Sequence, residues 1–323
     1  MFLTVVNQNR RIVITMKNRM VGTKGNNIKK DEKRNFYLMV APWIIGFLLF
    51  TLIPMLVSFA LSFMKWDYIG KAKYIGLANY IAMFHDTLFY KSLTVTTVYS
   101  VVSVPLTLIV AFIFAMLLNS DIKGLSVFRT IFYLPSLVAG AAASVLWLWM
   151  FNPQFGVINT ILSYFGIKGP GWIFDKNWAL PALIIMSLWS VGGSMLIYLS
   201  GLQGIPTELH EAAKIDGASA RVRLFKITIP MMTPIIFYNL VIGIIGSFQI
   251  FTQAYVMTNG GPQYSTYFYV FNLYQNAFMY FNIGYASALA WVLFFIIMAL
   301  TAIVFKSSAA WVFYGNETSG GKK

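Results

Sequence analysis

The sequence contains no cysteine and only two histidines among its 323 residues. The lack of cysteine excludes disulfide bonds and any site in which a thiolate binds a metal. The two histidines, His85 and His210, lie in different predicted loops, so neither zinc nor haem is expected to bind and no metal site is predicted. An intramembrane enzyme would need a converging set of His, Asp, Glu or Cys, and the apolar segments offer none.

Charged residues are also scarce. Asp, Glu, Lys and Arg make up 11% of the chain, whereas a typical soluble domain has about 25%. The chain is 58% hydrophobic and its mean hydropathy is +0.69. Its net charge of +14 comes from basic residues that border apolar segments, so anionic lipid head groups are the expected partners and nucleic acid is not. The composition therefore predicts an integral membrane protein.

Six apolar segments are long enough to cross a bilayer as helices, which requires about 20 residues each. None of them contains Asp, Glu, Lys or Arg, and residues 227–305 hold no charged residue at all. The predicted fold class is an all-α polytopic membrane protein with a membrane domain at 36–305. A basic tail at 1–35, expected to be disordered, precedes it, and a tail at 306–323 follows it. The predicted spans are 36–63, 93–118, 130–151, 179–202, 235–257 and 285–305.

Lys and Arg are distributed unevenly between the two sides of the predicted membrane. The two tails and the loops at 119–129 and 203–234 hold 18 of these residues, whereas the loops at 64–92, 152–178 and 258–284 hold six. Because loops rich in Lys and Arg stay in the cytoplasm, both termini and the 203–234 loop are expected to be cytoplasmic.

The 203–234 loop contains the pattern of a short amphipathic helix. Thr207 is a candidate N-cap, and Gly217 suits the left-handed residue that ends a helix. A second helical piece is expected from about Ala218 to Pro230. One face of the first helix carries Leu209, Ala212, Ala213 and Asp216, with Glu211 at its edge.

The residues of this loop allow two interpretations. The helix could lie on the membrane surface, as amphipathic interfacial helices do. Alternatively, the two alanines could let a partner protein approach closely, with Glu211 accepting hydrogen bonds from that partner.

Polar and small residues interrupt the apolar character of two spans. They are Ser187, Trp189, Ser190, Gly192, Gly193 and Ser194 in span four, and Asn239, Gly243, Gly246, Ser247, Gln249 and Gln253 in span five. The glycines are compatible with close helix packing. Placing an amide side chain in hydrocarbon without a hydrogen-bond partner costs free energy. The amides therefore indicate a water-accessible cavity through which a solute could pass. Sugars suit such a lining, because hydroxyls and amides bind their hydroxyl groups and aromatic rings cover their C–H faces.

The order of residues in the 203–234 loop resembles a known family. Glu211-Ala212-Ala213, then Gly217, then I-T-I-P at 227–230, are similar to the EAA loop of ABC-importer permeases. The resemblance implies a type I importer permease in which this loop forms the coupling helix that docks on a cytoplasmic ATPase. The implied coupling residues are Glu211, Ala212, Ala213, Asp216 and Gly217.

Other motifs resemble the sugar-importing branch of that family, the maltose and glycerol-phosphate type. They are M-T-N-G-G-P at 257–262, G-Y-A at 284–286, L-N-S at 118–120 and F-R-T-I-F-Y-L-P at 128–135, and the resemblance spans about residues 36–305. It implies a sugar as the solute and a location in the bacterial cell (inner) membrane. The implied substrate-binding residues are Trp189, Ser190, Gly193, Gly243, Ser247 and Gln249.

The same resemblance implies several partners. No G-x-x-x-x-G-K-[ST] motif occurs in the sequence, so ATP and Mg are expected to bind a separate cytoplasmic ATPase dimer and the chain itself is not expected to be an enzyme. A second homologous permease subunit and an extracytoplasmic solute-binding protein complete the expected importer.

Alternative functions remain open at this point. One is an ABC permease for a non-sugar solute such as an amino acid, a polyamine or a phosphonate. Another is an ion-coupled transporter, which is disfavoured because that class usually carries carboxylates within its spans. The residues leave open which sugar is carried and how long it is. They also leave open whether the ATPase is shared.

Overall fold

A computed structural model of the protein describes residues 32–68, 70–120 and 124–313. The expected tail at 1–35 lies outside these residues except for its last four, which are helical, and the predicted C-terminal tail is described only as far as residue 313. The chain divides between Ala60 and Leu61 into two units, which are described separately.

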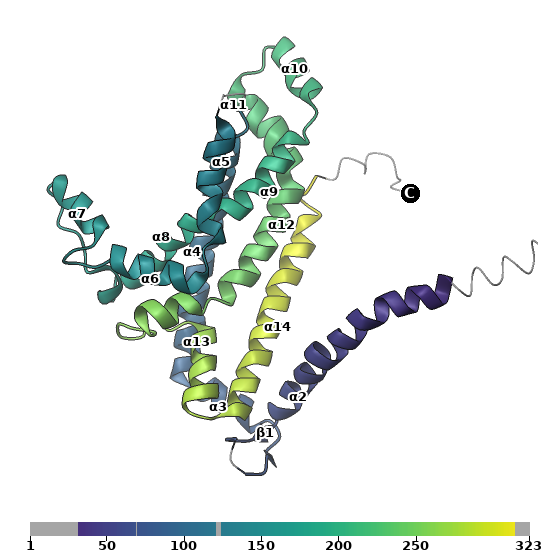
Figure 1. Cartoon of the computed structure of the whole chain (residues 1–323), viewed down its shortest axis with the longest axis vertical. Helices are drawn as coiled ribbons and strands as arrows, with labels where there is room; N and C mark the ends of the chain where they lie inside the picture. Colours follow the sequence, from purple (N-terminus) through teal and green to yellow (C-terminus); the bar gives the residue numbers. More distant parts are fainter. Residues whose placement is uncertain (1–31, 69, 121–123, 314–323) are drawn as a thin grey trace, which may run out of the picture. The chain divides into compact units, whose positions relative to one another are not determined.

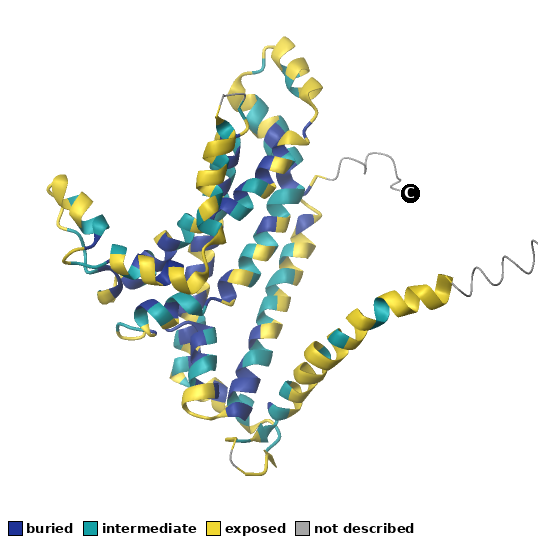
Figure 2. Ribbon diagram, in the orientation of Figure 1, coloured by how far each residue is buried: buried dark blue, intermediate teal, exposed yellow. Residues whose placement is uncertain are grey.

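The described part of the first unit is one apolar helix. It belongs to the segment Glu32–Leu61, which contains the π-helical turn η1 (Leu48–Leu52) followed by α2 (Ile53–Leu61). None of its residues is buried within the chain (Figure 2). The predicted first span, 36–63, covers most of this helix.

The second unit is a bundle of helices around α4 (Thr87–Leu117). A hairpin of β1 (Met64–Lys65) and β2 (Lys73–Tyr74), paired antiparallel, and the short helix α3 (Ala78–His85) precede α4. The remaining elements, in chain order, are α5 (Leu125–Tyr133), η2 (Leu134–Leu137), α6 (Gly140–Met150), α7 (Val157–Tyr164), η3 (Trp172–Phe174), α8 (Ala179–Ser187), η4 (Leu188–Ser190), α9 (Gly192–Gln203), α10 (Thr207–Ile215), α11 (Ala220–Arg223), η5 (Leu224–Thr228), α12 (Ile229–Phe248), η6 (Ala254–Thr258), α13 (Tyr269–Tyr274), η7 (Gln275–Met279) and α14 (Ile283–Ser308).

The core of this unit lies along α4, which packs against α9, α12 and α13, while α14 packs against α12 and α13 (Figure 1). On α4, Ala111 and Ala115 are fully buried, and they share an apolar cluster with Met195 and Tyr198 of α9 and Met232 of α12. Small residues on α4 therefore let two other helices approach its backbone closely.

The described chain has four to six segments that are long and apolar enough to cross a membrane, six if each bent helix pair is one span, which confirms the predicted fold class. Four are continuous helices: Glu32–Leu61, Thr87–Leu117, Ala220–Phe248 and Ile283–Ser308. Two are pairs broken by a bend. The pair Leu125–Leu137 and Gly140–Met150 bends by 99°, and the pair Ala179–Ser190 and Gly192–Gln203 bends by 46°.

The predicted third and fifth spans are wrong in detail. Span three, 130–151, is not one straight helix, because the backbone at Val138 and Ala139 is extended between Pro135 and Gly140. Span five, 235–257, begins too late and ends too late, since the helix runs from Ala220 to Phe248. Hydropathy placed that end too late, because apolar residues, Ile250, Phe251 and those at 254–257, continue beyond Phe248.

The helix through Ala220 also passes Pro230, where the second helical piece of the loop was expected to stop. The π-helical turn η5 immediately precedes this proline, and the Ile229 amide hydrogen-bonds the Leu224 carbonyl oxygen. A π turn shifts the hydrogen-bond register by one residue, which leaves room for a ring that would otherwise clash with the preceding turn.

Gly192 and Gly193, at the start of α9, provide a matched test of helix packing. A Cβ on Gly192 would lie 2.5 Å from the Phe132 carbonyl oxygen and 2.8 Å from Cα of Tyr133, whereas a Cβ on Gly193 would meet nothing within 4 Å. We expect Gly192→Ala to lower the unfolding free energy by about 1–3 kcal/mol, because backbone atoms of α5 cannot move aside cheaply. Gly193→Ala is the control. Thermal unfolding of the purified chain in detergent measures both variants, and equal midpoints would contradict this account of the packing.

Candidate functional site: a polar cavity beside the end of α12

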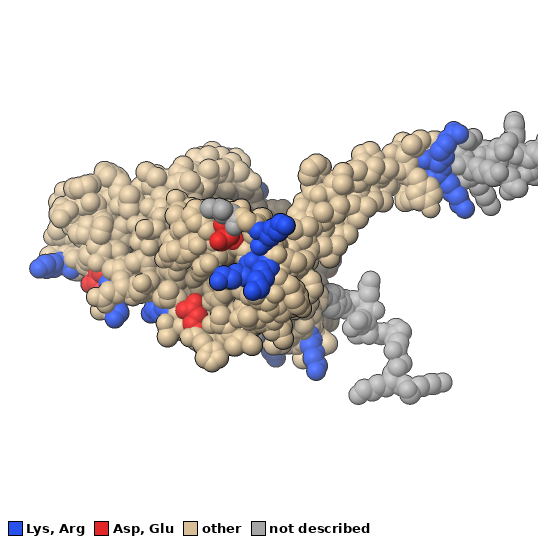
Figure 3. All heavy atoms as spheres, turned by 90° about the horizontal axis from the view of Figure 1, so that it is seen from below, with Lys and Arg blue, Asp and Glu red and all other residues tan. Residues whose placement is uncertain are grey.

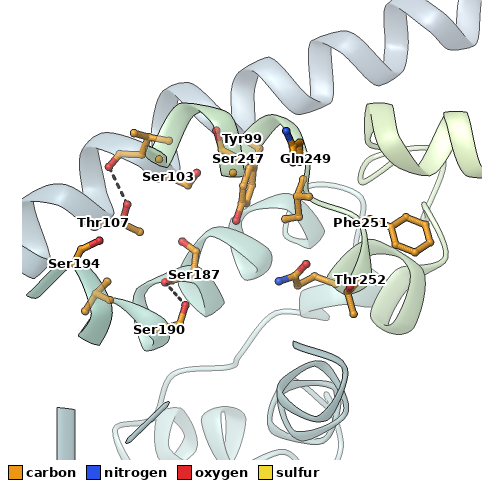
Figure 4. Close-up of a pocket in the computed structure, with 16 residues that line it drawn as sticks. Tyr99, Ser103, Thr107, Ser187, Ser190, Ser194, Ser247, Gln249, Phe251 and Thr252 are labelled. Carbon is orange, nitrogen blue, oxygen red and sulfur yellow. Dashed lines mark hydrogen bonds between the residues drawn. The ribbon is translucent and has the colours of Figure 1, made fainter. Parts of the chain in front are cut away.

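A cavity of about 410 Å³ lies where α12 stops. The helical backbone ends at Phe248, and residues 249–251 are irregular. The cavity is lined from three directions, by α4, by the bent segment from α8 to α9, and by the end of α12 with the residues that follow it (Figure 4). A volume of this size is within the usual range for small-molecule sites, about 300–1,000 Å³.

Hydroxyl and amide groups dominate the lining of this cavity. They belong to Tyr99, Ser103, Thr107, Ser187, Ser190, Ser194, Ser247, Gln249, Thr252 and Gln253. None of the described residues that line it is Asp, Glu, Lys or Arg. The site can therefore both donate and accept hydrogen bonds without carrying a charge.

Several of these hydroxyl groups donate hydrogen bonds to backbone carbonyl oxygens of their own helix. Ser187 donates to the Ile184 carbonyl oxygen at 2.6 Å, and Thr107 donates to that of Val104 at 2.9 Å. Their oxygen lone pairs remain available as acceptors. The side-chain amides of Gln249 and Gln253 also line this cavity, and each can both donate to and accept from a solute.

A second cavity of about 210 Å³ adjoins the first. Both are lined by Tyr99, Ser187, Ser190 and Gln253, so these residues form the boundary between them. The second cavity also reaches Trp189 and Ser136, and Pro135 and Gly140 beside the bend of the third span. The breaks in spans three, four and five thus meet around one polar space.

Buried polar residues of α4 hold this region together. The hydroxyls of Ser100 and Ser247 lie 2.6 Å apart and join α4 to α12. Thr96 Oγ1 accepts a hydrogen bond of 2.9 Å from the backbone amide of Tyr269, which is the first residue of α13. Near the start of α4, Asn272 Nδ2 donates to Ser92 Oγ at 3.3 Å. These contacts hold the residues on both sides of the break after Phe248 against one continuous helix, α4.

The predicted substrate-binding residues do not all meet in the structure. Ser190, Gly243, Ser247 and Gln249 line the larger cavity, whereas Trp189 lines only the smaller one. Gly193 lines neither. A Cβ on Gly243 would lie 3.1 Å from Val104 Cγ1, so this glycine also lets α12 approach α4.

Sequence reasoning missed the contribution of α4. Tyr99, Ser103 and Thr107 line the larger cavity, yet the second span was treated as apolar. The available signal was the spacing of Thr96, Ser100, Ser103 and Thr107, which places four hydroxyl residues on one helical face.

The predicted coupling residues lie on and just after α10, which projects beyond the bundle at the end opposite α3 (Figure 1). None of the residues of α10 is buried, and Ile215 is 86% exposed (Figure 2). Glu211 and Ala212 are exposed, and Ala213 is half-buried. The helix therefore presents most of its surface away from the rest of the chain.

The end of α10 has the geometry that the sequence indicated. Gly217 has a φ of +76°, and the amide of Ala218 donates to the Ala213 carbonyl oxygen at 2.8 Å while the amide of Gly217 donates to that of Lys214 at 3.0 Å. This pair of hydrogen bonds is a Schellman motif. The start differs from expectation, because Pro206 occupies the cap position and Thr207 is already the first helical residue.

Seen from the end that carries β1 and α3, the surface is mostly uncharged, with a few clustered Lys and Arg side chains and fewer acidic ones (Figure 3). This end includes Lys65, Lys71 and Lys73 of the hairpin region.

Comparison with known proteins identifies relatives over most of the chain. The probable ABC transporter permease protein YesP of Bacillus subtilis is 45% identical over 296 residues, covering 90% of this chain and 95% of the relative. The sn-glycerol-3-phosphate transport system permease protein UgpA of Agrobacterium fabrum is 34% identical, covering 86% and 96%. The trehalose/maltose transport system permease protein MalF of Thermococcus litoralis is 32% identical, covering 87% and 96%.

A solved structure supports the fold. A chain in the crystal structure of a bacterial alginate ABC transporter, in complex with an alginate pentasaccharide-bound periplasmic protein, aligns with a TM-score of 0.77. The alignment covers 87% of this chain and 96% of that chain at 23% sequence identity.

A family model matches residues 124–312, which include α5 to α14 and therefore α10 and all three breaks that border the cavities. Together with the full-length relatives, this match shows that the chain is a membrane permease component of an ABC transporter rather than an enzyme. The chain belongs to the family of binding-protein-dependent transport system inner membrane components.

Proposed function

We propose that this chain forms one half of the membrane pore of an ATP-driven importer, and that its solute is a sugar or an oligosaccharide. The observation that carries the proposal is the lining of the larger cavity, where hydroxyls and amides surround a space of about 410 Å³ without any charged side chain. A sugar presents many hydroxyl groups, each both a donor and an acceptor, and such a lining satisfies them. Amino acids and phosphonates carry charges that this lining does not neutralise.

The names of the relatives support this choice of solute. Among them is a permease named for trehalose and maltose, which are uncharged saccharides, and the aligned crystal structure belongs to a transporter of alginate, a polysaccharide. We propose that the remaining subunits are a second homologous permease, a cytoplasmic ATPase dimer that binds ATP and Mg, and an extracytoplasmic solute-binding protein.

Ser190 provides the sharpest test of the solute path, because it borders both cavities and its side chain is exposed. Ser190→Leu adds apolar volume where hydroxyls meet, so uptake by the reconstituted importer should fall at least tenfold while subunit assembly is unchanged. The solute panel is tritiated maltose, trehalose, maltotriose, an alginate trisaccharide, sn-glycerol 3-phosphate and histidine.

The matched control is Ser163→Leu, which changes an exposed serine at the end of α7, away from both cavities. Uptake of histidine but of no saccharide would contradict the proposed solute class. Normal saccharide uptake by Ser190→Leu would contradict the proposed path.

We further propose that the α10 end of the bundle is cytoplasmic. The support is the distribution of Lys and Arg in the sequence, of which 18 belong to the tails and loops predicted to share a side with α10 and six to the other loops. Because the chain has no cysteine, a single labelling cysteine can be introduced without first replacing native ones. In whole cells, a membrane-impermeant maleimide should label Lys168→Cys at once, and Lys214→Cys only after permeabilisation. The reverse pattern would overturn this orientation.

We propose that α10 docks in a groove of the ATPase. Its support is the exposure of the helix together with apolar side chains that have no cover within the chain, Leu209 at 43% and Ile215 at 86% exposed. From Ala220 the chain continues as one helix to Phe248 at the larger cavity, so the docking segment is joined to the solute path by a short link and a rigid element.

Two variants test this docking. Gly217→Val places a β-branched residue at a φ of +76°, which costs about 1 kcal/mol or more and should misdirect the helix end. Glu211→Lys reverses the charge at the docking edge. Both should lower co-purification of the ATPase and solute-stimulated ATP hydrolysis by several-fold.

The control is Gly166→Val. Gly166 has a φ of +70°, follows α7 and has open space around its Cα, so the backbone strain is matched without any role in α10. If Gly217→Val and Glu211→Lys behave like this control, α10 is not the coupling element.

A further inference from the structure

Four aromatic rings form a continuous group beside the larger cavity. Phe251 is central: its ring lies 5.4 Å from that of Tyr255 in a stacked arrangement and 4.9 Å from that of Tyr274. Tyr274 in turn lies 5.3 Å from Tyr255 and 5.2 Å from Phe278. We refer to Phe251, Tyr255, Tyr274 and Phe278 as the aromatic platform. Its rings come from the irregular residues after α12, from η6, from α13 and from η7.

Buried rings pack against the aromatic platform, and two of the platform's own rings are exposed. Phe271, only 1% exposed, stacks on Phe251 at 6.5 Å, and Tyr267 packs against Phe271 at 5.4 Å. Burial raises the pKa of Tyr267, so its phenol stays protonated and donates to Asn272 Oδ1 at 3.2 Å. In front, Tyr255 is 42% exposed and Phe278 is 55% exposed. Rings held by a buried layer present a preorganised surface, which reduces the entropy lost on binding.

Phe251 also lines the larger cavity, so the platform and the cavity are continuous. In Figure 4, Phe251 lies beside Gln249 and Thr252, at the opposite end of the lining from Thr107 and Ser194. The platform includes residues of α13 and lies toward the end of the bundle opposite α10 (Figure 1). A solute that arrives from that end would meet the rings before the hydroxyl-lined part.

The chemistry of these rings selects among possible occupants. The C–H face of a pyranose ring packs on an aromatic face, and the hydroxyls around its rim can bond to the phenols of Tyr255 and Tyr274. A lipid chain would gain nothing from those phenols or from the adjoining amides of Gln249 and Gln253. The continuity with a hydroxyl-lined cavity therefore favours a carbohydrate.

We propose that the aromatic platform is a stacking site for a pyranose ring of the solute, at the mouth of the larger cavity. The inference rests on the proposed sugar import and adds to it a subsite for a cyclic saccharide. It assigns apolar stacking to the mouth and hydrogen bonding to the interior, so that a ring is held before its hydroxyls are engaged.

Transport kinetics give the first test. In the complete reconstituted importer, the double variant Tyr255→Leu/Phe278→Leu should raise the saccharide concentration for half-maximal uptake at least fivefold, using whichever panel saccharide the wild type takes up fastest. Tyr255→Phe keeps the ring and removes only the phenol hydroxyl, so it should raise this concentration by less than the double variant does. Tyr164→Leu is the control, because Tyr164 ends α7 and is 84% exposed but borders neither cavity.

Fluorine NMR of the same complex tests contact directly. With 4-fluorophenylalanine at position 278 and no ATP, titration with maltotriose should shift the fluorine signal, whereas sn-glycerol 3-phosphate, which has no ring, should not. A soluble gadolinium chelate should broaden the fluorine signal of the assembled complex. This broadening should decrease as maltotriose is added, because the bound sugar shields the ring from the chelate.

The outcomes separate the two proposals. If saccharides are imported but neither the shift nor the kinetic change occurs, the platform proposal is wrong and the proposed function stands. If the chelate does not reach position 278 in the assembled complex, the rings are buried against the second permease subunit and the platform proposal is likewise overturned. If no panel saccharide is imported or shifts the signal, both proposals fail.

Discussion

The structure depends on hydrogen bonds that the long helix α4 forms with polar groups near the places where other helices break. In hydrocarbon an unpaired backbone amide or carbonyl costs several kcal/mol, so a helix can stop within a membrane only where other groups take over its hydrogen bonds. Here α4 supplies hydroxyl groups that bond to one backbone amide and to two side chains around the break after Phe248. Thr96 accepts from the first amide of α13, Ser100 pairs with Ser247 next to the end of α12, and Ser92 accepts from Asn272.

This constraint explains why the cavity is where it is. Ser247 is bonded to Ser100 of α4, and the amides of Gln249 and Gln253 line the polar cavity, so the segment after Phe248 can leave the helical path without placing these polar groups in lipid. The departure opens a space that the hydroxyls of α4 and of the α8–α9 segment also border. The same departure brings Phe251 and Tyr255 beside Tyr274, so the cavity and the aromatic platform have a common structural origin.

The other end of the same helix lies next to the surface loop that carries α10. From Ala220 to Phe248 the helix has 29 residues, a length of roughly 44 Å at 1.5 Å per residue. The π-helical turn before Pro230 keeps this helix continuous where the sequence suggested a stop. A displacement of α10 would therefore act on a single stiff element whose far end lines the cavity, and Gly217 sets the direction in which α10 leaves it.

The sequence by itself determined the membrane class, the six apolar segments and the position and left-handed end of α10. These follow from local properties, namely hydropathy over about 20 residues and the unique freedom of glycine at positive φ. The tertiary structure decided where the helices break, because Gln249 and the residues after it are no less suited to a helix than those before it. It also decided the lining, since Tyr99, Ser103 and Thr107 join Ser190 and Ser247 only through packing between distant segments. Gly193, next to Ser194 in sequence, lies outside the cavity because a helix rotates about 100° per residue, and only the packing decides which face is inward.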